Sequence, residues 1–183
     1  MFELANLENP SQSAAQVLEI ETELAAYHWD QVKDRDAELT YNKKSFSELT
    51  QLAASFNWPL WIQSSNTPAK VLDQVIIRQP SYLEGLSKLL AAFDLPKWRS
   101  WLSWHVLSGA SPYLSAAFVN ENFNFYGTTL SGIPKLKDRW KRGVGLVEGA
   151  LGEAVGQIYV ERHFGENAKT KMVELVANLT KAY

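Results

Sequence analysis

The chain has 183 residues, of which 46% are hydrophobic, a length and composition typical of one folded domain with a buried core. Its formal net charge of -2 argues against general nucleic-acid binding, because that function favours a basic surface. The lack of cysteine excludes disulfide bonds, a thiolate nucleophile and cysteine-ligated zinc, and no run approaches the roughly 18 apolar residues of a membrane span.

Helix-start signals mark the first third of the chain. Asn9 as N-cap and Pro10 at the first helical position predict a helix that runs to about Asp34. Residues 45–48, Ser-Phe-Ser-Glu, form a capping box that predicts a short second helix. We expect that helix to end at residues 57–59, Asn-Trp-Pro, because proline does not continue a helix.

Further helices are predicted through the middle of the chain. A second capping box at residues 81–84 predicts one helix, and residues 94–109, with an N-capping aspartate, predict the next. Residues 111–122 begin with Ser-Pro and predict another helix, and residues 122–134 predict an ordered, aromatic and glycine-rich connector. Residues 75–77, Val-Ile-Ile, are a β-branched run that predicts at most a minimal strand.

The stretch 135–164 reads as one long helix, because no proline falls between Lys137 and Phe164. It nevertheless contains glycines, and each glycine inside a helix costs about 1 kcal/mol relative to alanine. Steps of four, three and four residues place four of them on one face: Gly145, Gly149, Gly152 and Gly156. We expect this face to let a partner helix approach closely; the alternative is that the glycines break the stretch into loops.

These patterns together predict the fold class. We expect an all-α, multi-helix domain that occupies residues 1–183 and is organised around the long helix 135–164 as its central element. A last amphipathic helix follows, with its apolar side chains at Met172, Val173, Leu175, Val176 and Leu179.

No catalytic or metal-ligating constellation is found in the sequence. His28, His105 and His163 lie far apart, outside any His-x-x-x-His or Glu-x-x-His pair, and are interpreted as surface or hydrogen-bonded core residues. Residues 127–132 have the outline of a phosphate-binding loop, but the Ile-Pro that follows supplies neither its lysine nor its magnesium ligand. Three carboxylates of the long helix are interpreted as solvated or salt-bridged: Glu148, Glu153 and Glu161.

A basic cluster surrounds Trp140 at the start of the long helix. Its members are Lys135, Lys137, Arg139, Lys141 and Arg142. They predict either a site for an anionic partner or a peptide carboxylate, or a solvated helix face whose charges pair with nearby acidic residues.

The same region resembles a known family. Residues 139–142, Arg-Trp-Lys-Arg, followed by the segment 151–164 with Tyr159, resemble the neprilysin/endothelin-converting-enzyme family of zinc metallopeptidases. Earlier in the chain, other segments resemble motifs of that family and occur in the family's order. They are Arg35-Asp36 with Tyr41-Asn42, Phe56-Asn57-Trp58, Gln79 to Leu83, and Trp101 to Leu107. The resemblance runs from about Leu18 to the C-terminus. It implies structural roles for Arg139, Trp140 and Tyr159 beside the four aligned glycines.

The resemblance also implies a function. Such enzymes hydrolyse peptides in a catalytic domain with His-Glu-x-x-His, a glutamate ligand in Glu-x-x-x-Asp and an Asn-Ala-Tyr motif, none of which occurs here. It therefore implies that this chain is an internal fragment of the large helical domain, a lid that caps the active-site cavity. The chain alone is expected to hold no cofactor and to be inactive. Zinc would belong to the parent enzyme, and the partners would be the catalytic zinc domain and peptide substrates.

Two further expectations complete the sequence reading. The eukaryotic members of the family rely on disulfides, so the lack of cysteine favours a bacterial relative, either cytoplasmic or secreted. The alternative function is a free-standing helical protein-interaction module that docks a partner on the basic cluster or on an aromatic face formed by Trp98, Trp101 and Trp104.

Overall fold

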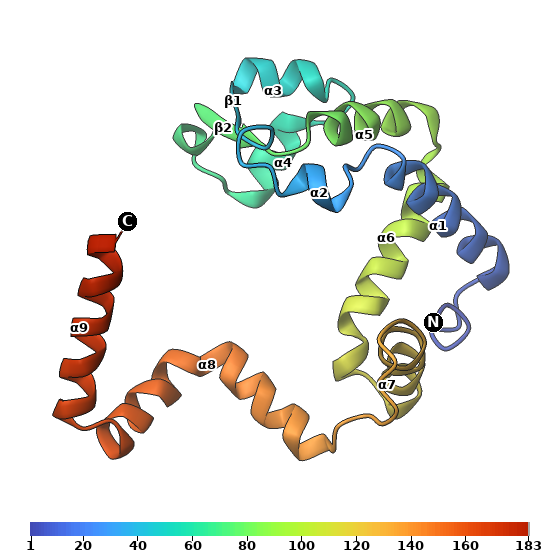
Figure 1. The fold of residues 1–183 in the computed structure, drawn as a ribbon. Coiled ribbons are helices and arrows are strands. Elements are labelled where there is room, and N and C mark those ends of the chain that lie inside the picture. The colour runs from blue at the N-terminus through green and yellow to red at the C-terminus, as the bar shows by residue number, and fades with distance from the viewer. Residues whose placement is uncertain (183) are drawn as a thin grey trace. The chain divides into compact units, whose positions relative to one another are not determined.

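The computed structural model describes residues 1–182, and the chain forms two units, Met1–Phe125 and the residues from Tyr126 onward. Figure 1 shows that helices dominate, so the all-α prediction is confirmed. The elements of the first unit are α1 (Pro10–Ala25), α2 (Gln31–Asp34), β1 (Asn42–Ser45), α3 (Phe46–Leu52), α4 (Trp58–Ser65), η1 (Ala69–Leu72), β2 (Gln74–Ile77), α5 (Pro80–Ala92), α6 (Leu95–Ala110), η2 (Ser111–Tyr113) and α7 (Ala116–Asn122). A π-helical segment, η3 (Phe123–Leu130), leads into α8 (Arg139–His163) and α9 (Glu166–Ala182).

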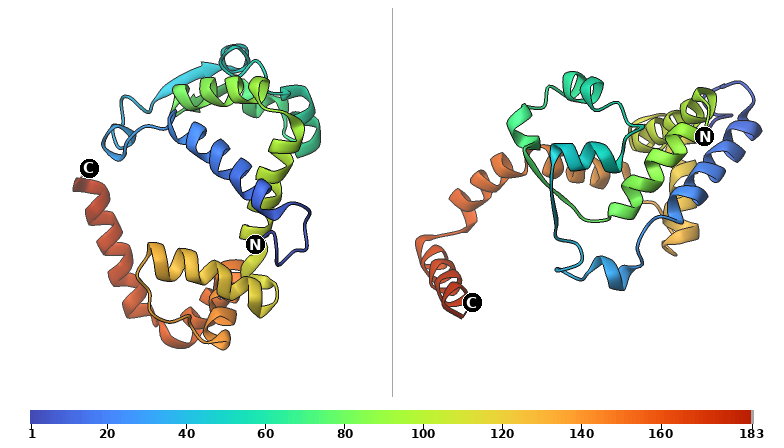
Figure 2. Two further views of the ribbon diagram at one scale, coloured as in Figure 1. Left: turned by 90° about the vertical axis from the view of Figure 1, so that its right-hand side faces the viewer. Right: turned by 90° about the horizontal axis from the view of Figure 1, so that it is seen from above.

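The core of the first unit lies where α1 packs against α5 and α6 (Figure 2). Ile20 and Leu24 are one helical turn apart on α1, and both are buried with Leu89 of α5. Partly buried side chains surround these three: Tyr27, Tyr82, Leu86, Phe93, Trp98 and Trp101. The predicted aromatic face is therefore divided, because two of its three tryptophans pack against the core.

A two-stranded antiparallel sheet connects the parts of the first unit that come before and after α3 and α4. Asn42 pairs with Ile77 and Ser45 with Gln74. The minimal strand predicted at residues 75–77 is confirmed as β2. Its partner β1 was not predicted, because Asn-Lys-Lys-Ser contains no β-branched or aromatic residue.

Two of the predicted helix caps are confirmed. Ser45 and Glu48 form the predicted capping box of α3. The Asp94 side chain accepts a hydrogen bond from the backbone N–H of Lys97 and so caps α6.

Other boundary predictions were wrong. The first helix ends at Ala25 rather than near Asp34, and Asn9 lies in a left-handed conformation without a side-chain capping bond. Residues 57–59 do not terminate a helix; they begin α4, because Asn57 caps it and Pro59 lies in its first turn, where proline is tolerated. Ser81 does not cap α5, since its hydroxyl donates to the backbone carbonyl of Tyr27.

Contrary to the prediction, the long helix α8 is not continuous. It bends at Leu151, whose φ of -130° and ψ of 23° are not helical, between Gly149 and Gly152. Among the described residues, no atom lies within 4 Å of a Cβ added at Gly145, Gly149, Gly152 or Gly156. Within residues 126–182 of the second unit no helix packs on this glycine face, and the close approach of a partner helix there stays a prediction. The single-domain assignment of residues 1–183 stays a prediction.

None of the helices within the described residues is both long enough and apolar enough to cross a membrane.

A single glycine sets the distance between α5 and the end of α1. A Cβ added at Gly85 would overlap the ring of Tyr27. We expect Gly85→Ala to lower the free energy of unfolding by about 1–3 kcal/mol, because an overpacked contact must displace the ring or the helix. Urea unfolding followed by circular dichroism measures this. Gly109→Ala is the matched control: Gly109 lies in α6 with no neighbour within 4 Å of the added Cβ, so its alanine variant should be no less stable. Equal effects of the two substitutions would contradict the close contact.

Candidate functional site

The predicted structural residues of the second unit lie on α8. Trp140 is 67% exposed, and Lys141 Nζ lies 5.3 Å from the centre of its ring. Lys141 also forms an ion pair with Asp138 at 3.6 Å, and the ring of Tyr159 lies 5.1 Å from that of His163. Lys141 thus has an acidic partner, whereas Arg142 is half-buried, so both interpretations of the basic cluster stay open. The structural roles of Arg139, Trp140 and Tyr159 stay predictions.

The histidines make separate contacts with the protein. His28 Nδ1 lies 3.1 Å from Gln79 Oε1, and the imidazole stacks on Tyr82 with ring centroids 4.5 Å apart. His105 Nε2 lies 3.0 Å from Glu21 Oε1, between the rings of Trp101 and Trp104. Each of these two imidazoles thus engages a different pair of elements of the first unit.

A zinc site does not fit the residues that are present. Within residues 1–182, no group of three or more His, Cys, Asp or Glu side chains is arranged to hold a metal ion. We therefore derive no catalytic step through a metal from this part of the chain.

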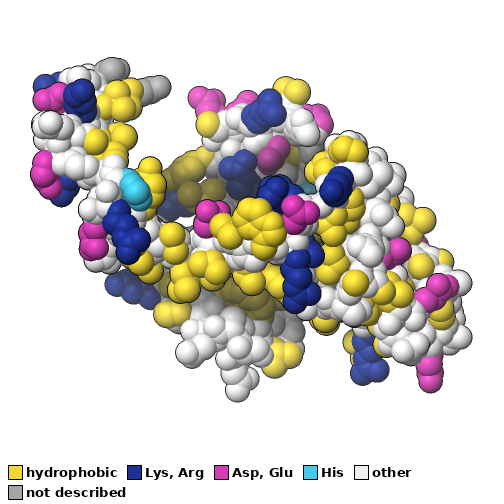
Figure 3. Space-filling model, turned by 90° about the horizontal axis from the view of Figure 1, so that it is seen from below, with side chains coloured by type: hydrophobic (Ala, Val, Ile, Leu, Met, Phe, Trp, Pro, Cys, Tyr) yellow, Lys and Arg dark blue, Asp and Glu magenta, His cyan; other side chains and the backbone are white. Residues whose placement is uncertain are grey.

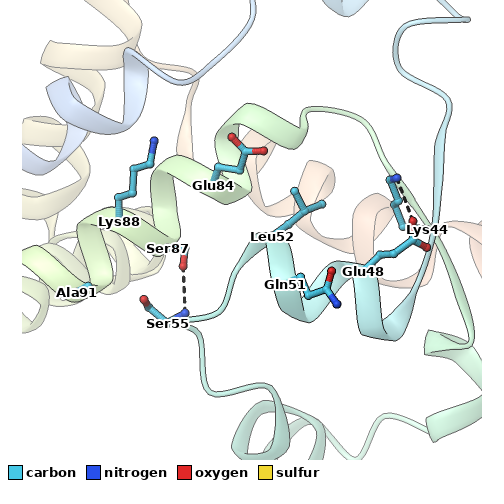
Figure 4. A pocket seen from close by; sticks show the side chains of 9 residues that line it. All are labelled: Lys44, Glu48, Gln51, Leu52, Ser55, Glu84, Ser87, Lys88 and Ala91. Atoms are coloured by element: carbon cyan, nitrogen blue, oxygen red, sulfur yellow. Dashed lines mark hydrogen bonds and ion pairs between the residues drawn. The ribbon is translucent and has the colours of Figure 1, made fainter.

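One candidate binding feature is an open groove between α3 and α5, with a volume of about 660 Å³ (Figure 4). We call it the α3–α5 groove. Its residues come from the end of β1, from α3, from the turn after α3 and from α5: Lys44, Glu48, Gln51, Leu52, Ser55, Glu84, Ser87, Lys88 and Ala91. Two lysines and two glutamates line it, so it offers both charges to a polar ligand.

One glutamate of this groove is committed to the local fold. The Glu48 carboxylate accepts hydrogen bonds from the backbone N–H and hydroxyl of Ser45, both at 2.9 Å, and from Lys44 Nζ at 3.1 Å. The hydrogen bonds from Ser45 and the nearby lysine lower the pKa of Glu48 from 4.5 to about 2. Glu48 therefore stays ionised at neutral pH and acts as a helix cap rather than a proton donor.

The hydroxyls of the α3–α5 groove lack the geometry of a nucleophile. Ser87 is buried, and its oxygen accepts a hydrogen bond from the backbone N–H of Ser55 at 3.0 Å. No histidine lines the groove, so neither serine has a neighbouring imidazole base there. The arrangement supports binding of a polar segment rather than covalent chemistry.

A second groove, of about 430 Å³, lies beside a hydrogen-bonded cluster around Gln79. The side-chain oxygen of Gln79, Oε1, accepts a hydrogen bond from the backbone N–H of Trp29 at 3.1 Å. The side-chain nitrogen, Nε2, donates one to Asp34 Oδ1 at 2.9 Å. Together with the contact to His28, one glutamine joins the α1–α2 turn to the start of α5. We call these contacts the Gln79 hub. Sequence reasoning missed the hub because its partners lie about fifty residues away and share no motif spacing with it.

Tyr82 borders the same groove and is electrostatically perturbed. Burial first, and then the negative charge of Glu21, raise the pKa of Tyr82 above its ordinary value. Its phenol therefore stays protonated and serves as the surface on which His28 stacks.

The comparisons with known proteins agree with the fold. The family model described as Peptidase family M13 matches residues 1–183. The chain belongs to this family. The resemblance to neprilysin and endothelin-converting enzyme stated from the motifs is thereby confirmed.

Relatives of this M13 chain include longer proteins from animals and bacteria. It is 30% identical over 174 residues to human endothelin-converting enzyme 1, a match that covers 92% of this chain and 22% of the enzyme. It is 29% identical over 143 residues to the neutral endopeptidase of Lactobacillus helveticus. That match covers 78% of this chain and 22% of the endopeptidase. The chain thus spans about a fifth of the length of these curated relatives.

Solved structures match the M13 chain as well. The zinc metalloprotease Zmp1 of Mycobacterium tuberculosis, in a crystal structure with an inhibitor, is 42% identical to it with a TM-score of 0.84. That match covers 94% of this chain and 26% of the Zmp1 chain. Zmp1 in its open state gives a TM-score of 0.83 over the same share of this chain.

The lowered pKa of Glu48 makes stability depend on pH. Because the folded state holds this pKa below the unfolded value of 4.5, the carboxylate stabilises the fold above pH 4.5. That contribution is lost as the pH falls from 4.5 to about 2. We expect Glu48→Gln to lower the urea midpoint at pH 6 and to have little effect at pH 2. A deficit of equal size at both pH values would show that the charge is not the cause.

We expect the Gln79 hub to contribute to the free energy of unfolding. We expect Gln79→Ala to lower the free energy of unfolding by about 2 kcal/mol, because it leaves the Trp29 N–H and the Asp34 carboxylate without this partner. Gln51→Ala is the control: Gln51 is exposed in the α3–α5 groove, and its removal should change stability by less than about 0.5 kcal/mol. Differential scanning calorimetry of both variants measures the contrast, and equal losses would refute the hub.

Proposed function

We propose that this chain is part of a longer zinc metalloendopeptidase that hydrolyses peptides, and that it forms a helical, non-catalytic lid over the catalytic site. The proposal rests on one observation: the family model matches the whole of this chain, but the chain spans only 22% of the length of its curated relative, human endothelin-converting enzyme 1. A piece of this size contributes one part of the enzyme, and the rest of the polypeptide is its first partner.

The lack of a metal-binding group supports assigning hydrolysis to other parts of the enzyme. Residues 1–182 hold no cluster of side chains suited to a metal ion, and the serines of the α3–α5 groove have no histidine beside them. Zinc, its ligands and the general base would then lie outside these residues. This chain would act on substrates through shape and charge alone.

A lid needs a rigid wall, and the first unit has the contacts to provide one. Two kinds of contact hold α1 to the helices that follow: the buried cluster around Ile20, Leu24 and Leu89, and the Gln79 hub. A further hydrogen bond joins α1 to α6, in which Glu21 Oε1 accepts from Trp101 Nε1 at 2.6 Å. Such a wall would exclude large proteins and admit peptides.

We also infer a bacterial origin. The support is the 42% identity to Zmp1 of Mycobacterium tuberculosis, since the human endothelin-converting enzyme 1 and the Lactobacillus helveticus neutral endopeptidase are 30% and 29% identical. Both cytoplasmic and secreted locations are compatible with this origin.

A peptidase assay tests the proposed function. We expect purified residues 1–183 to show no chelator-sensitive cleavage of an internally quenched peptide, with or without added zinc. We expect the reading frame that contains them to encode His-Glu-x-x-His, and its full product to cleave that peptide in a chelator-sensitive way. The full product should spare folded proteins, because the lid limits entry.

Two outcomes would contradict the proposal. Chelator-sensitive turnover by residues 1–183 alone would place catalysis in this chain. A reading frame without His-Glu-x-x-His would favour the free-standing interaction module instead.

A further inference from the structure

An amphipathic helix in the second unit exposes an apolar face. We call this surface the α9 face; its residues are Met172, Leu175, Val176 and Leu179. Their spacing of three, four and seven residues places them on one side of the helix. They are 49, 53, 53 and 56% exposed, respectively. Figure 3 shows yellow side chains along one edge of this helix and charged ones along the other.

Such a helix requires a covering partner. Most of the stability of an amphipathic helix in a protein comes from packing its apolar face rather than from its intrinsic helix propensity. Every side chain described for α9 is exposed, so the second unit does not itself supply that packing.

We propose that the α9 face docks an apolar helical segment that belongs to the same polypeptide and lies outside residues 1–183. The proposal rests on the proposed function in one respect, namely that residues 1–183 belong to a longer chain. The curated relatives, of which this chain spans 22%, and Zmp1, of which it covers 26%, have the length that such a segment requires. The 94% of this chain that matches Zmp1 is too large a share to leave out the second unit.

Photo-crosslinking tests the proposal in the full-length polypeptide expressed from its natural reading frame. p-Benzoylphenylalanine replaces Leu175 on the α9 face, and a matched variant carries it in place of Glu174, the adjacent residue on the polar side. We expect Leu175 to crosslink several-fold more efficiently, without a change in molecular mass on a denaturing gel. Mass spectrometry should identify the crosslinked peptide outside residues 1–183.

The other outcomes overturn the proposal. A product of twice the mass would identify a second copy as the occupant, and a product of any other mass would identify a different protein. A crosslink within residues 1–183, equal yields at the two positions, or no crosslink at Leu175 would also overturn it.

A second measurement avoids any effect of the substitution on folding. In hydrogen exchange of the unsubstituted proteins, the α9 amides should exchange several-fold more slowly in the full-length polypeptide than in residues 1–183. Equal rates would overturn the docking. Chelator-sensitive peptidase activity of the same preparation reports on the proposed function separately: an active enzyme with unprotected α9 refutes the docking alone, and an inactive one with protected α9 refutes the function alone.

Discussion

The contact between Gly85 and Tyr27 determines how the helices of the first unit meet. Because Gly85 has no side chain, α5 lies directly against the Tyr27 ring at the end of α1. That approach allows Leu89, one turn further along α5, to be buried with Ile20 and Leu24. It also allows Ser81, one turn earlier, to donate to the Tyr27 carbonyl. Apolar burial and polar satisfaction therefore depend on the same short distance between two helices.

Local signals in the sequence predicted the parts of this fold that are stabilised locally. The capping box at Ser45 and the Asp94 cap each depend on residues within one turn, and the β-branched run of β2 has its own strand propensity; all three are present. Boundaries set by distant partners were not predictable in this way. Ser81 has the spacing of a cap, but its hydroxyl is bonded to a residue fifty-four positions earlier. Likewise, the polar β1 sequence becomes a strand only because β2 supplies its hydrogen bonds.

The glycines of α8 also show that spacing within one helix does not determine its structure. Their spacing defines a face of an ideal helix, but the backbone bends at Leu151 between the second and third of them. Glycines on both sides of Leu151 lower the cost of such a bend. The candidate grooves were beyond sequence reasoning for a related reason. Glu48 and Lys88 line one surface only because α3 and α5 pack together, and no periodicity within either helix contains that information.

The motifs on which the family resemblance rests contain residues whose hydrogen bonds link neighbouring elements. Such residues can predict a fold. Gln79, at the start of one motif, forms the hub that links α5 to the α1–α2 turn. Trp58, in another, donates its indole N–H to the Ala53 carbonyl and so closes the turn between α3 and α4. Asp36, in a third, accepts from the backbone N–H groups of Glu38 and Leu39. Residues that hold elements together identify a fold and its family. They do not identify a reaction, because their polar atoms are already used by the protein and are not directed at a substrate.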